Sequence, residues 1–501
     1  MVTPFQSSLI FYYEVRRVDA RLGRRLSVTN YNSRLGCARL SEQTRRVTDA
    51  SAVPSEPAPS EPTPSDPSTP SIATAQIHGG LRPREIQNTV VTPIYQTAAY
   101  EFESLQAAQE LFALKRSGNL YSRNANPTQK VFEDRMAALE SGVGALATGS
   151  GQAAVAISLL SLATKGHHIV ASAQLYGGTV DLLTDTFDDF GIEVTLVDQD
   201  DIGAWSGAVR PNTRAFFAEG IGNPTASVLP MADVADVAHA AGVPLIIDST
   251  LATPVLQRPK EFGADFVVHS ATKFLGGHGS SMGGVIVDLG TFDFGAEPEK
   301  WPQFTRPYKR VGGVVLWEEF GRDRSAYLMY AKTKWVHDLG PSISPFNAFQ
   351  ILQGIETLDL RVTRQSASAL AVAEYLDAHP GVSKVNHPGL VTSPWHHLVP
   401  RYLPRGAGAV FSFDVAAGPD AVEAVIDGLE LFSLVANIGD VRSLVIRPAT
   451  TTHSHLTPEQ LADAGFSHAT IRLSIGLEDP ADLIRDLERV LDASVAKSGK
   501  D

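Results

Sequence analysis

Short apolar segments alternate with helix-like segments from residue 131 to residue 287, and this alternation constrains the fold more than any other feature. The strand-like segments are 145–148, 168–171, 193–197, 215–219, 244–248, 266–270 and 284–287, and the helix-like segments are 131–142, 152–164, 180–190 and 231–241. Strands that alternate with amphipathic helices form a parallel sheet with helices on both faces. The sequence therefore predicts an α/β domain with a mostly parallel sheet, over residues 131–340.

The pattern changes on either side of this region. Beyond residue 340 we expect helices at 345–356 and 361–379. Further strand and helix signals follow at 382–385, 409–415, 419–428, 443–446, 470–474 and 481–494. This mixture predicts a smaller α+β domain over residues 341–501. Residues 73–130 show little periodicity apart from a short helix predicted around 105–116, and we interpret them as an arm that reaches a second subunit.

The first 72 residues differ from the rest in composition. Residues 1–46 contain nine Arg, no Lys and three acidic residues, and residues 51–72 contain seven prolines among Ser and Glu. Such a composition predicts a disordered extension without a packed core. An Arg-rich, acid-poor transit peptide is one alternative reading of the first part, and a start codon placed too far upstream is another.

Charge and cysteine usage exclude several functions for the remaining chain. The net charge is −13, and because residues 1–46 carry +6, the remainder carries −19. An acidic protein of this kind is not expected to bind nucleic acid. No apolar run reaches about 18 residues, so we expect no membrane span. The single cysteine, Cys37, lies in the extension, so the body has neither a cysteine nucleophile nor a cysteine metal site, and we assign no metal.

A lysine follows the predicted strand 266–270 in the stretch His269-Ser270-Ala271-Thr272-Lys273, with glycines directly after it. In an open parallel sheet, ligands bind at the carboxyl ends of the strands. Lys273 at such a position can form a Schiff base with an aldehyde cofactor, and the Ser270 and Thr272 hydroxyls can reach a phosphate. A plain loop lysine after a strand is the alternative.

Three other strand ends carry polar or aromatic residues. Gly149-Ser150-Gly151-Gln152 precedes a helix, whose first amides suit a phosphate, although a simple tight turn would look the same. Asp248 follows an apolar run and needs a buried partner, which is either a protonated pyridine nitrogen or a helix cap or local ion pair. Tyr176 precedes two glycines and can stack on a flat ring, although a lone tyrosine is more often part of the core.

These four features have a joint explanation that none of the alternatives offers. They supply a phosphate cradle, a ring stack, a counter-ion for a pyridine nitrogen and a lysine for an aldehyde. Pyridoxal 5′-phosphate (PLP) is the cofactor that needs this set.

From about Thr74 onward the chain resembles the Cys/Met-metabolism family of PLP-dependent enzymes, and within it the sulfhydrylase subgroup. The resemblance rests on long motifs that occur in order: YSRNANPT, SGQAA, LYGGT, IGNPTASV, DSTLATP, HSATKFLGGHG, SPFNAFQILQGIETL, LFSLVANIGDVRSLVIRPATTTHSHL and IRLSIG. It implies a fold type I, aspartate-aminotransferase-like transferase with PLP as cofactor. It also implies a cytoplasmic homotetramer built from dimers that share active sites.

The resemblance also implies roles for individual residues. Lys273 would be the Schiff-base lysine and proton shuttle, assisted by Tyr176. The other cofactor contacts would be Gly151, Gln152, Ser270 and Thr272 at the phosphate, Asp248 at the pyridine nitrogen, Tyr176 on the ring, Asn223 at the phenolic oxygen, and Tyr121 with Arg123 at the neighbouring subunit's phosphate. Arg472 and Asn437 would bind the substrate carboxylate.

The reaction implied is replacement of the γ-acetyl group of O-acetylhomoserine by sulfide, giving homocysteine and acetate in methionine biosynthesis and transsulfuration. Cystathionine γ-synthase or γ-lyase activity is the alternative within the family, and Asn437 favours the sulfhydrylase subgroup. A non-catalytic scaffold on the same fold is a third possibility, against which Lys273, Asp248 and Arg472 argue. Arg447 stands where the family usually has histidine, and we expect it to change the charge of the acyl-leaving pocket.

Overall fold

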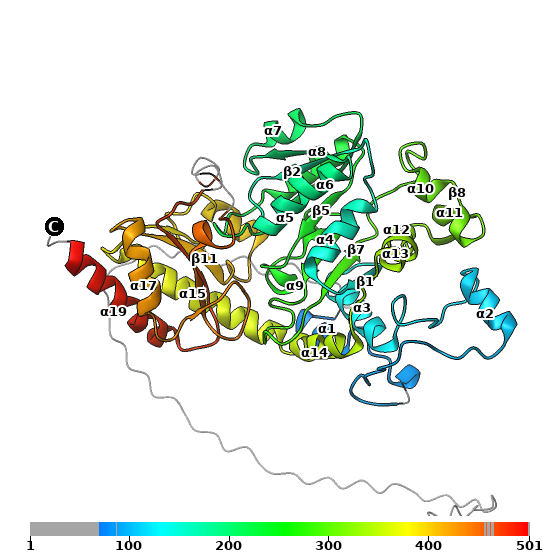
Figure 1. The fold of residues 1–501 in the computed structure, drawn as a ribbon, viewed down its shortest axis with the longest axis horizontal. Coiled ribbons are helices and arrows are strands. Elements are labelled where there is room, and N and C mark those ends of the chain that lie inside the picture. The colour runs from blue at the N-terminus through cyan, green and yellow to red at the C-terminus, as the bar shows by residue number, and fades with distance from the viewer. Residues whose placement is uncertain (1–69, 87, 455–456, 458–460, 462–464, 499–501) are drawn as a thin grey trace, which may run out of the picture. The chain divides into compact units, whose positions relative to one another are not determined.

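A seven-stranded sheet forms the centre of the larger part of the protein in the computed structural model, which describes residues 70–498 except 87, 455–456, 458–460 and 462–464. In spatial order its strands are β1 (Gly144–Thr148), β7 (Gly284–Asp288), β6 (Phe266–Ser270), β5 (Leu245–Asp248), β4 (Thr213–Glu219), β2 (His168–Ser172) and β3 (Glu193–Val197). Only β7 runs antiparallel to its neighbours, β1 and β6, and the remaining pairs are parallel (Figure 1). The predicted mostly parallel sheet is confirmed.

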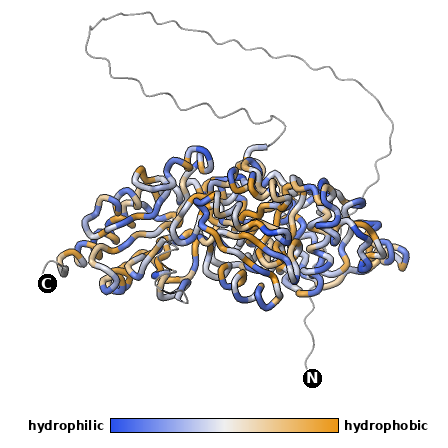
Figure 2. Tube along the Cα trace, turned by 90° about the horizontal axis from the view of Figure 1, so that it is seen from above, coloured by the Kyte–Doolittle hydropathy of each residue, from blue (hydrophilic) through white to orange (hydrophobic). Residues whose placement is uncertain are grey.

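Both faces of this sheet are covered, as the alternation of its side chains shows. In β5, Leu245 and Ile247 belong to one buried cluster, while Ile246 between them belongs to another. Neighbouring β4 divides in the same way, with Phe216 in the first cluster and Phe217 in the second. Because successive side chains of a strand point to opposite faces, each face has its own core. In Figure 2 the hydrophobic colouring follows these interior segments.

Helices from the region of alternating strands and helices cover both faces of the sheet. Towards the first cluster pack α3 (Pro127–Leu139) and α8 (Met231–Ala240), and towards the second packs α4 (Gly151–Leu160). The shorter helices of this region are α5 (Gly177–Asp181), α6 (Phe187–Asp189), α7 (Ile202–Gly207) and α9 (Thr253–Leu256). A π-helical turn at Leu182–Thr186 joins α5 to α6, so the helix predicted at 180–190 is present but not uniform.

Helix α3 begins earlier than the sequence pattern indicated. Its N-cap is Asn126, whose Oδ1 accepts a 2.9 Å hydrogen bond from the Thr128 amide, and Pro127 occupies the first helical position. Proline is tolerated there because its missing N–H would be unpaired anyway. Ahead of it lie α1 (Ile72–His78), a 3₁₀ turn at Pro83–Ile86, and α2 (Leu105–Phe112), which ends four residues before the predicted boundary.

Residues 300–340 contain structure that the pattern did not predict. They form α10 (Pro302–Thr305), the hairpin β8 (Pro307–Tyr308) and β9 (Val314–Val315), α11 (Leu316–Phe320), α12 (Ala326–Tyr330), a π-helical turn (Ala331–Val336) and α13 (His337–Leu339). Each piece is too short for a clear period. They are held instead by aromatic packing, with the Phe294 ring 5.2 Å from Trp301 and 4.3 Å from Phe304.

A five-stranded sheet follows, as the predicted α+β pattern requires. Its order is β10 (Val382–Asn386), β11 (Val410–Val415), β14 (Thr470–Ser474), β13 (Leu444–Ile446) and β12 (Ser433–Leu434), antiparallel except for β12 with β13. The described helices of this region are α14 (Pro345–Ile355), α15 (Leu358–Ala378), α16 (Val399–Tyr402), α17 (Val422–Gly428) and α19 (Pro480–Ser498), with 3₁₀ turns at His396–Leu398, Pro419–Ala421 and Pro448–Thr450. Two further 3₁₀ turns, Pro259–Phe262 and Lys309–Val311, lie before residue 340. No helix within the described ranges is long and apolar enough to cross a membrane.

The proposed division at residues 130 and 340 stays a prediction. Most of the extension proposed for residues 1–72, with Cys37 and the arginine cluster, lies outside the described residues. The described part of the chain belongs to one compact unit, Ser65–Asp501, which contains both sheets.

Candidate active site

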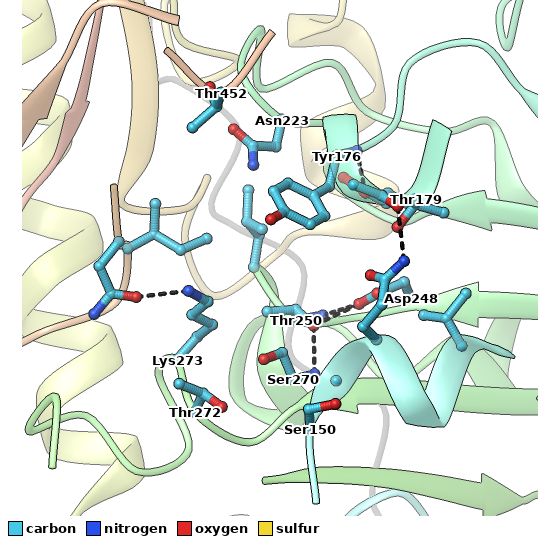
Figure 3. Close-up of a pocket in the computed structure, with 18 of the residues that line it drawn as sticks. Ser150, Tyr176, Thr179, Asn223, Asp248, Thr250, Ser270, Thr272, Lys273 and Thr452 are labelled. Atoms are coloured by element: carbon cyan, nitrogen blue, oxygen red, sulfur yellow. Dashed lines mark hydrogen bonds between the residues drawn. The ribbon is translucent and has the colours of Figure 1, made fainter. Parts of the chain in front are cut away.

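A cavity of about 550 Å³ lies at the carboxyl ends of β4, β5 and β6 and is closed by residues of the five-stranded sheet region. Ten of the twelve predicted site residues line it: Gly151, Gln152, Tyr176, Asn223, Asp248, Ser270, Thr272, Lys273, Asn437 and Arg472. In Figure 3 the Lys273 and Tyr176 side chains both extend into this space. Residues more than 300 positions apart in the chain therefore meet at one site.

The start of α4 forms one wall of the cavity. Ser150 caps the helix, its hydroxyl accepting a 3.2 Å hydrogen bond from the Ala153 amide. Gly151 and Gln152 occupy the first turn, where backbone amides have no partner within the helix and the helix dipole is positive. A Cβ at Gly151 would collide with the Ser270 side chain, so glycine is required for the helix start to lie this close to β6. The wall has the chemistry of a phosphate site.

Ser270 and Thr272 extend this wall of the cavity, which is suited to bind a phosphate. The Ser270 amide donates a 2.8 Å hydrogen bond to the Thr250 hydroxyl. The Thr272 hydroxyl is already engaged with the backbone of Gly283, donating to its oxygen at 3.2 Å and accepting from its amide at 3.1 Å. Both hydroxyl side chains are half-buried and line the cavity.

Asp248 is held by the residue two positions after it. Its Oδ1 accepts from the Thr250 amide at 2.9 Å and from the Thr250 hydroxyl at 2.5 Å. Burial raises the pKa of Asp248, and the hydrogen bonds from Thr250 oppose that rise. A cation next to the carboxylate would restore its preference for the charged form. Asp248 is therefore well suited to pair with a protonated ring nitrogen.

Tyr176 projects its ring over a glycine. A Cβ at Gly178 would lie 2.7 Å from the Tyr176 ring, so the ring packs closely on the glycine backbone. The Gln152 side-chain amide donates a 2.7 Å hydrogen bond to the Gly178 oxygen and joins this loop to the start of α4. The Tyr176 side chain remains partly open, at 44 % exposure, as a group that stacks on a ligand must be.

Lys273 reaches across the cavity to the smaller part of the protein. Its Nζ donates a 2.6 Å hydrogen bond to Oδ1 of Asn437. Burial lowers the pKa of Lys273 to about 8, with a smaller contribution from the positive charge of Arg472. An amine with this pKa is available in its neutral form near physiological pH, as a nucleophile or base must be.

Arg472 is almost fully enclosed, at 4 % exposure, and burial lowers its pKa to about 10. Its Nη1 donates to Oδ1 of Asn223 at 3.1 Å and its Nη2 to the backbone oxygen of Asn437 at 3.2 Å. No carboxylate is within salt-bridge distance of Arg472 among the described residues. A buried guanidinium held by neutral acceptors is suited to bind the carboxylate of a ligand.

Tyr121 and Arg123 lie elsewhere. The Tyr121 side chain is 46 % exposed, and the Arg123 guanidinium stacks 5.5 Å from the Tyr121 ring centroid. Neither residue lines the cavity of its own chain. Their predicted role at a neighbouring subunit's phosphate stays a prediction.

Arg447 does not lie at the cavity, contrary to the expectation that it changes the charge of an acyl-leaving pocket. Its guanidinium donates from Nη2 to the backbone oxygens of His468, at 2.7 Å, and Pro419, at 3.1 Å, and does not line the cavity. Two backbone carbonyls hold the side chain away from the site, so its charge is not added to an acyl-leaving pocket there.

Sequence reasoning missed several cavity residues: Ser150, Val155, Thr179, Glu219, Thr250, Leu251, Met282, Ala436, Ile438 and Thr452. Glu219 had a detectable signal, because it ends the apolar strand Ala215–Glu219 in the way that Asp248 ends its own. No group of three or more potential metal ligands occurs within the ranges that the structure describes.

Comparisons with known proteins agree with this geometry. Residues 73–492 match the family described as Cys/Met metabolism PLP-dependent enzyme. The O-acetyl-L-homoserine sulfhydrylase of Leptospira meyeri is 48 % identical over 426 residues, covering 83 % of this chain and 96 % of that protein.

Two solved structures are similar over most of their length. One is a Campylobacter jejuni protein described as an O-acetylhomoserine (thiol)-lyase, which contains N′-pyridoxyl-lysine-5′-monophosphate. It has a TM-score of 0.80 and 35 % identity, covering 84 % of this chain and 99 % of that one. The other is the cystathionine gamma synthase of Xanthomonas oryzae, with a TM-score of 0.74 and 30 % identity, covering 86 % and 100 %. The predicted fold type and PLP as cofactor are confirmed, and the chain belongs to the Cys/Met metabolism family of PLP-dependent enzymes.

Proposed function

We propose that this protein replaces the γ-acetyl group of O-acetylhomoserine with sulfide, releasing homocysteine and acetate. One observation carries the proposal: the Lys273 amine and the Arg472 guanidinium line one cavity and are joined through Asn437. An amino-acid substrate needs a base near its α carbon and a cation at its carboxylate, and these two residues supply both. The sulfhydrylase name of the 48 % identical relative supports the choice of ester and sulfur donor.

Different cavity residues would bind different parts of the cofactor. The Gly151 and Gln152 amides with the Ser270 and Thr272 hydroxyls would bind its phosphate. Asp248 would hold its ring nitrogen, Tyr176 would cover its ring, and Asn223 would donate to its phenolic oxygen. When bound, PLP supplies an electron sink for the carbanion that forms on the substrate.

Lys273 would move the protons. In its neutral form Nζ accepts the α proton and then delivers it to neighbouring atoms of the substrate, with the Tyr176 hydroxyl assisting. Asn437 Oδ1 holds the Lys273 amine at the side of the cavity where Arg472 binds the carboxylate, so base and substrate are oriented by one residue. A fixed geometry of this kind lowers the entropic cost of reaction.

A second subunit completes the proposal. Tyr121 and Arg123 are exposed and stacked, and neither serves its own cavity. We assign them to the phosphate site of a partner in a dimer, and we expect two such dimers to form a cytoplasmic homotetramer.

The test is a product assay with O-acetylhomoserine as the common substrate. Sulfide, cysteine and methanethiol are supplied in turn, and products are identified by mass spectrometry. Homocysteine formed with sulfide at a higher kcat/KM than cystathionine formed with cysteine supports the proposal. Faster cystathionine formation would assign the protein to the cystathionine γ-synthase branch, and loss of γ substituents without any added thiol would indicate a lyase.

A further inference from the structure

Glu219 is a second buried carboxyl at this site. It ends β4, pairs in register with Asp248 of β5, and is 4 % exposed while lining the cavity. The roles assigned to the other cavity residues leave Glu219 without one. A buried carboxyl at the carboxyl edge of the sheet requires an explanation.

The Glu219 carboxyl connects two separate backbone segments. Its Oε1 accepts a 2.6 Å hydrogen bond from the Tyr176 amide, 43 positions earlier in the chain. The backbone amide of Asn223 also acts on this carboxyl and opposes the rise in its pKa. Tyr176 is the residue that covers the ring, and Asn223 is the residue at the phenolic oxygen. One side chain therefore binds the backbone of Tyr176 and faces the backbone of Asn223, two of the residues assigned to the cofactor ring.

The surroundings favour the protonated form of Glu219. Its Oε2 is buried and has no hydrogen-bond partner in the described part of the chain, which a buried carboxylate anion would not tolerate. Burial, followed by the neighbouring charge of Asp248, raises the pKa of Glu219 well above its ordinary value. The other titratable groups lining the cavity are Tyr176, Asp248, Lys273 and Arg472, and of these Asp248 is the one whose charge acts on Glu219.

We propose that Glu219 is a positioning residue, a neutral hydrogen-bonding clamp that holds Tyr176 and Asn223 against the cofactor ring. Its neutrality leaves Asp248 as the single negative charge opposite the single positive charge of the ring nitrogen. The inference rests on the proposed cofactor contacts and does not depend on which thiol the enzyme uses.

Two variants distinguish a neutral hydrogen-bonding role of Glu219 from a role that needs its negative charge. Glu219→Gln keeps a carbonyl acceptor of the same shape and cannot ionise, whereas Glu219→Leu keeps the approximate volume and removes the acceptor. PLP binding is measured by absorbance titration of the cofactor-free protein, without substrate. The dissociation constant is expected to stay within about twofold of the wild type for Gln and to rise at least about tenfold for Leu.

Spectra provide a readout that a purely structural role would not change. The absorbance of bound PLP is followed from pH 6 to pH 9, and the wild-type and Glu219→Gln profiles are expected to superimpose. A shifted midpoint in Gln, or a tenfold loss of PLP affinity in Gln, would show that Glu219 is ionised and would overturn the proposal. Wild-type PLP affinity in Glu219→Leu would also overturn the proposal. If Glu219→Leu does not fold, the PLP affinity and the pH profile of Glu219→Gln decide.

These measurements are independent of the sulfhydrylase assay. Failure to form homocysteine with normal cofactor titrations would reject the proposed reaction and retain the clamp. Failure of the titrations with normal homocysteine formation would do the reverse.

Discussion

The Nζ atom of Lys273 lies 2.6 Å from Oδ1 of Asn437, although the two residues are 164 positions apart in the chain. The backbone oxygen of the same asparagine accepts from Nη2 of Arg472. Asn437 therefore contacts Lys273, the proposed base, through its side chain and Arg472, the proposed carboxylate-binding cation, through its backbone. One residue thus links the Lys273 amine to the Arg472 guanidinium.

Removing the lysine should abolish catalysis without unfolding the protein. Lys273→Ala deletes the amine that lines the cavity together with Asp248 and Tyr176, while the half-buried position tolerates a smaller side chain. We expect γ-replacement to fall to background and the circular dichroism spectrum to stay unchanged. Borohydride reduction of the wild type should attach the cofactor to the peptide containing Lys273, and label on another lysine would refute the assignment.

Replacing the buried arginine should weaken substrate use and spare cofactor binding. Arg472→Lys keeps a positive charge but loses the planar fork that binds a carboxylate through two hydrogen bonds. A charge-assisted hydrogen bond contributes about 1.5–3 kcal/mol, so kcat/KM for O-acetylhomoserine should fall by about one to several orders of magnitude. Bound-cofactor absorbance is the control. Near-normal turnover would mean that the carboxylate binds elsewhere.

The rate of α-proton removal should depend on pH through Lys273. The pKa of this amine is lowered from 10.5 to about 8, and only the neutral amine can accept a proton. Neutral amine increases as pH rises, so exchange of the substrate α proton with deuterated water should rise about tenfold per pH unit below pH 8 and level off above it. A profile that is flat between pH 6 and pH 8 would exclude Lys273 as the base.

Two truncations should show that α1 contributes to stability and that the residues before it do not. Ala75 of α1 is buried, Oε1 of Gln76 accepts a 2.9 Å hydrogen bond from the Asp359 amide, and the buried Arg135 guanidinium donates to the Gln76 and Gly79 oxygens. A chain that begins at Ser71 should keep the activity and Tm of the full chain.

A chain that begins at Arg82 lacks those acceptors and should be less stable. Leaving the buried Arg135 unpaired costs about 1–3 kcal/mol or more, which differential scanning calorimetry can measure. Equal Tm values for the two shortened chains would show that α1 contributes nothing to stability.

Restoring the usual family residue at Arg447 should not alter ester choice. Because the guanidinium is held by the His468 and Pro419 oxygens outside the cavity, Arg447→His should leave the ratio of kcat/KM for O-acetylhomoserine and O-succinylhomoserine within about twofold. Asn437→Ser, a change inside the cavity, serves as the matched comparison. A large change in the ratio with Arg447→His would place Arg447 at the site after all.

The sequence alone was sufficient for elements whose residues follow a simple period. Strands such as Glu193–Val197 and Phe266–Ser270 were predicted with the bounds that the structure shows, because apolar runs between turn residues have few alternatives. Four short motifs, around Gly151, Tyr176, Asp248 and Lys273, together identified the cofactor, because they supply a phosphate cradle, a ring stack, a counter-ion and an amine.

Tertiary structure decided what depends on distant contacts. The hydrogen bond between Lys273 and Asn437, the attachment of Tyr176 to Glu219 and the orientation of Arg447 away from the site all join segments that no local pattern relates. The short helices between residues 300 and 340 are held by aromatic contacts and not by a periodicity of their own: Phe304 packs on Phe294, and Tyr327 packs on Phe266 of β6. Local sequence determines which backbone conformations are favourable, whereas burial and charge at the site arise only when the two sheets and their helices come together.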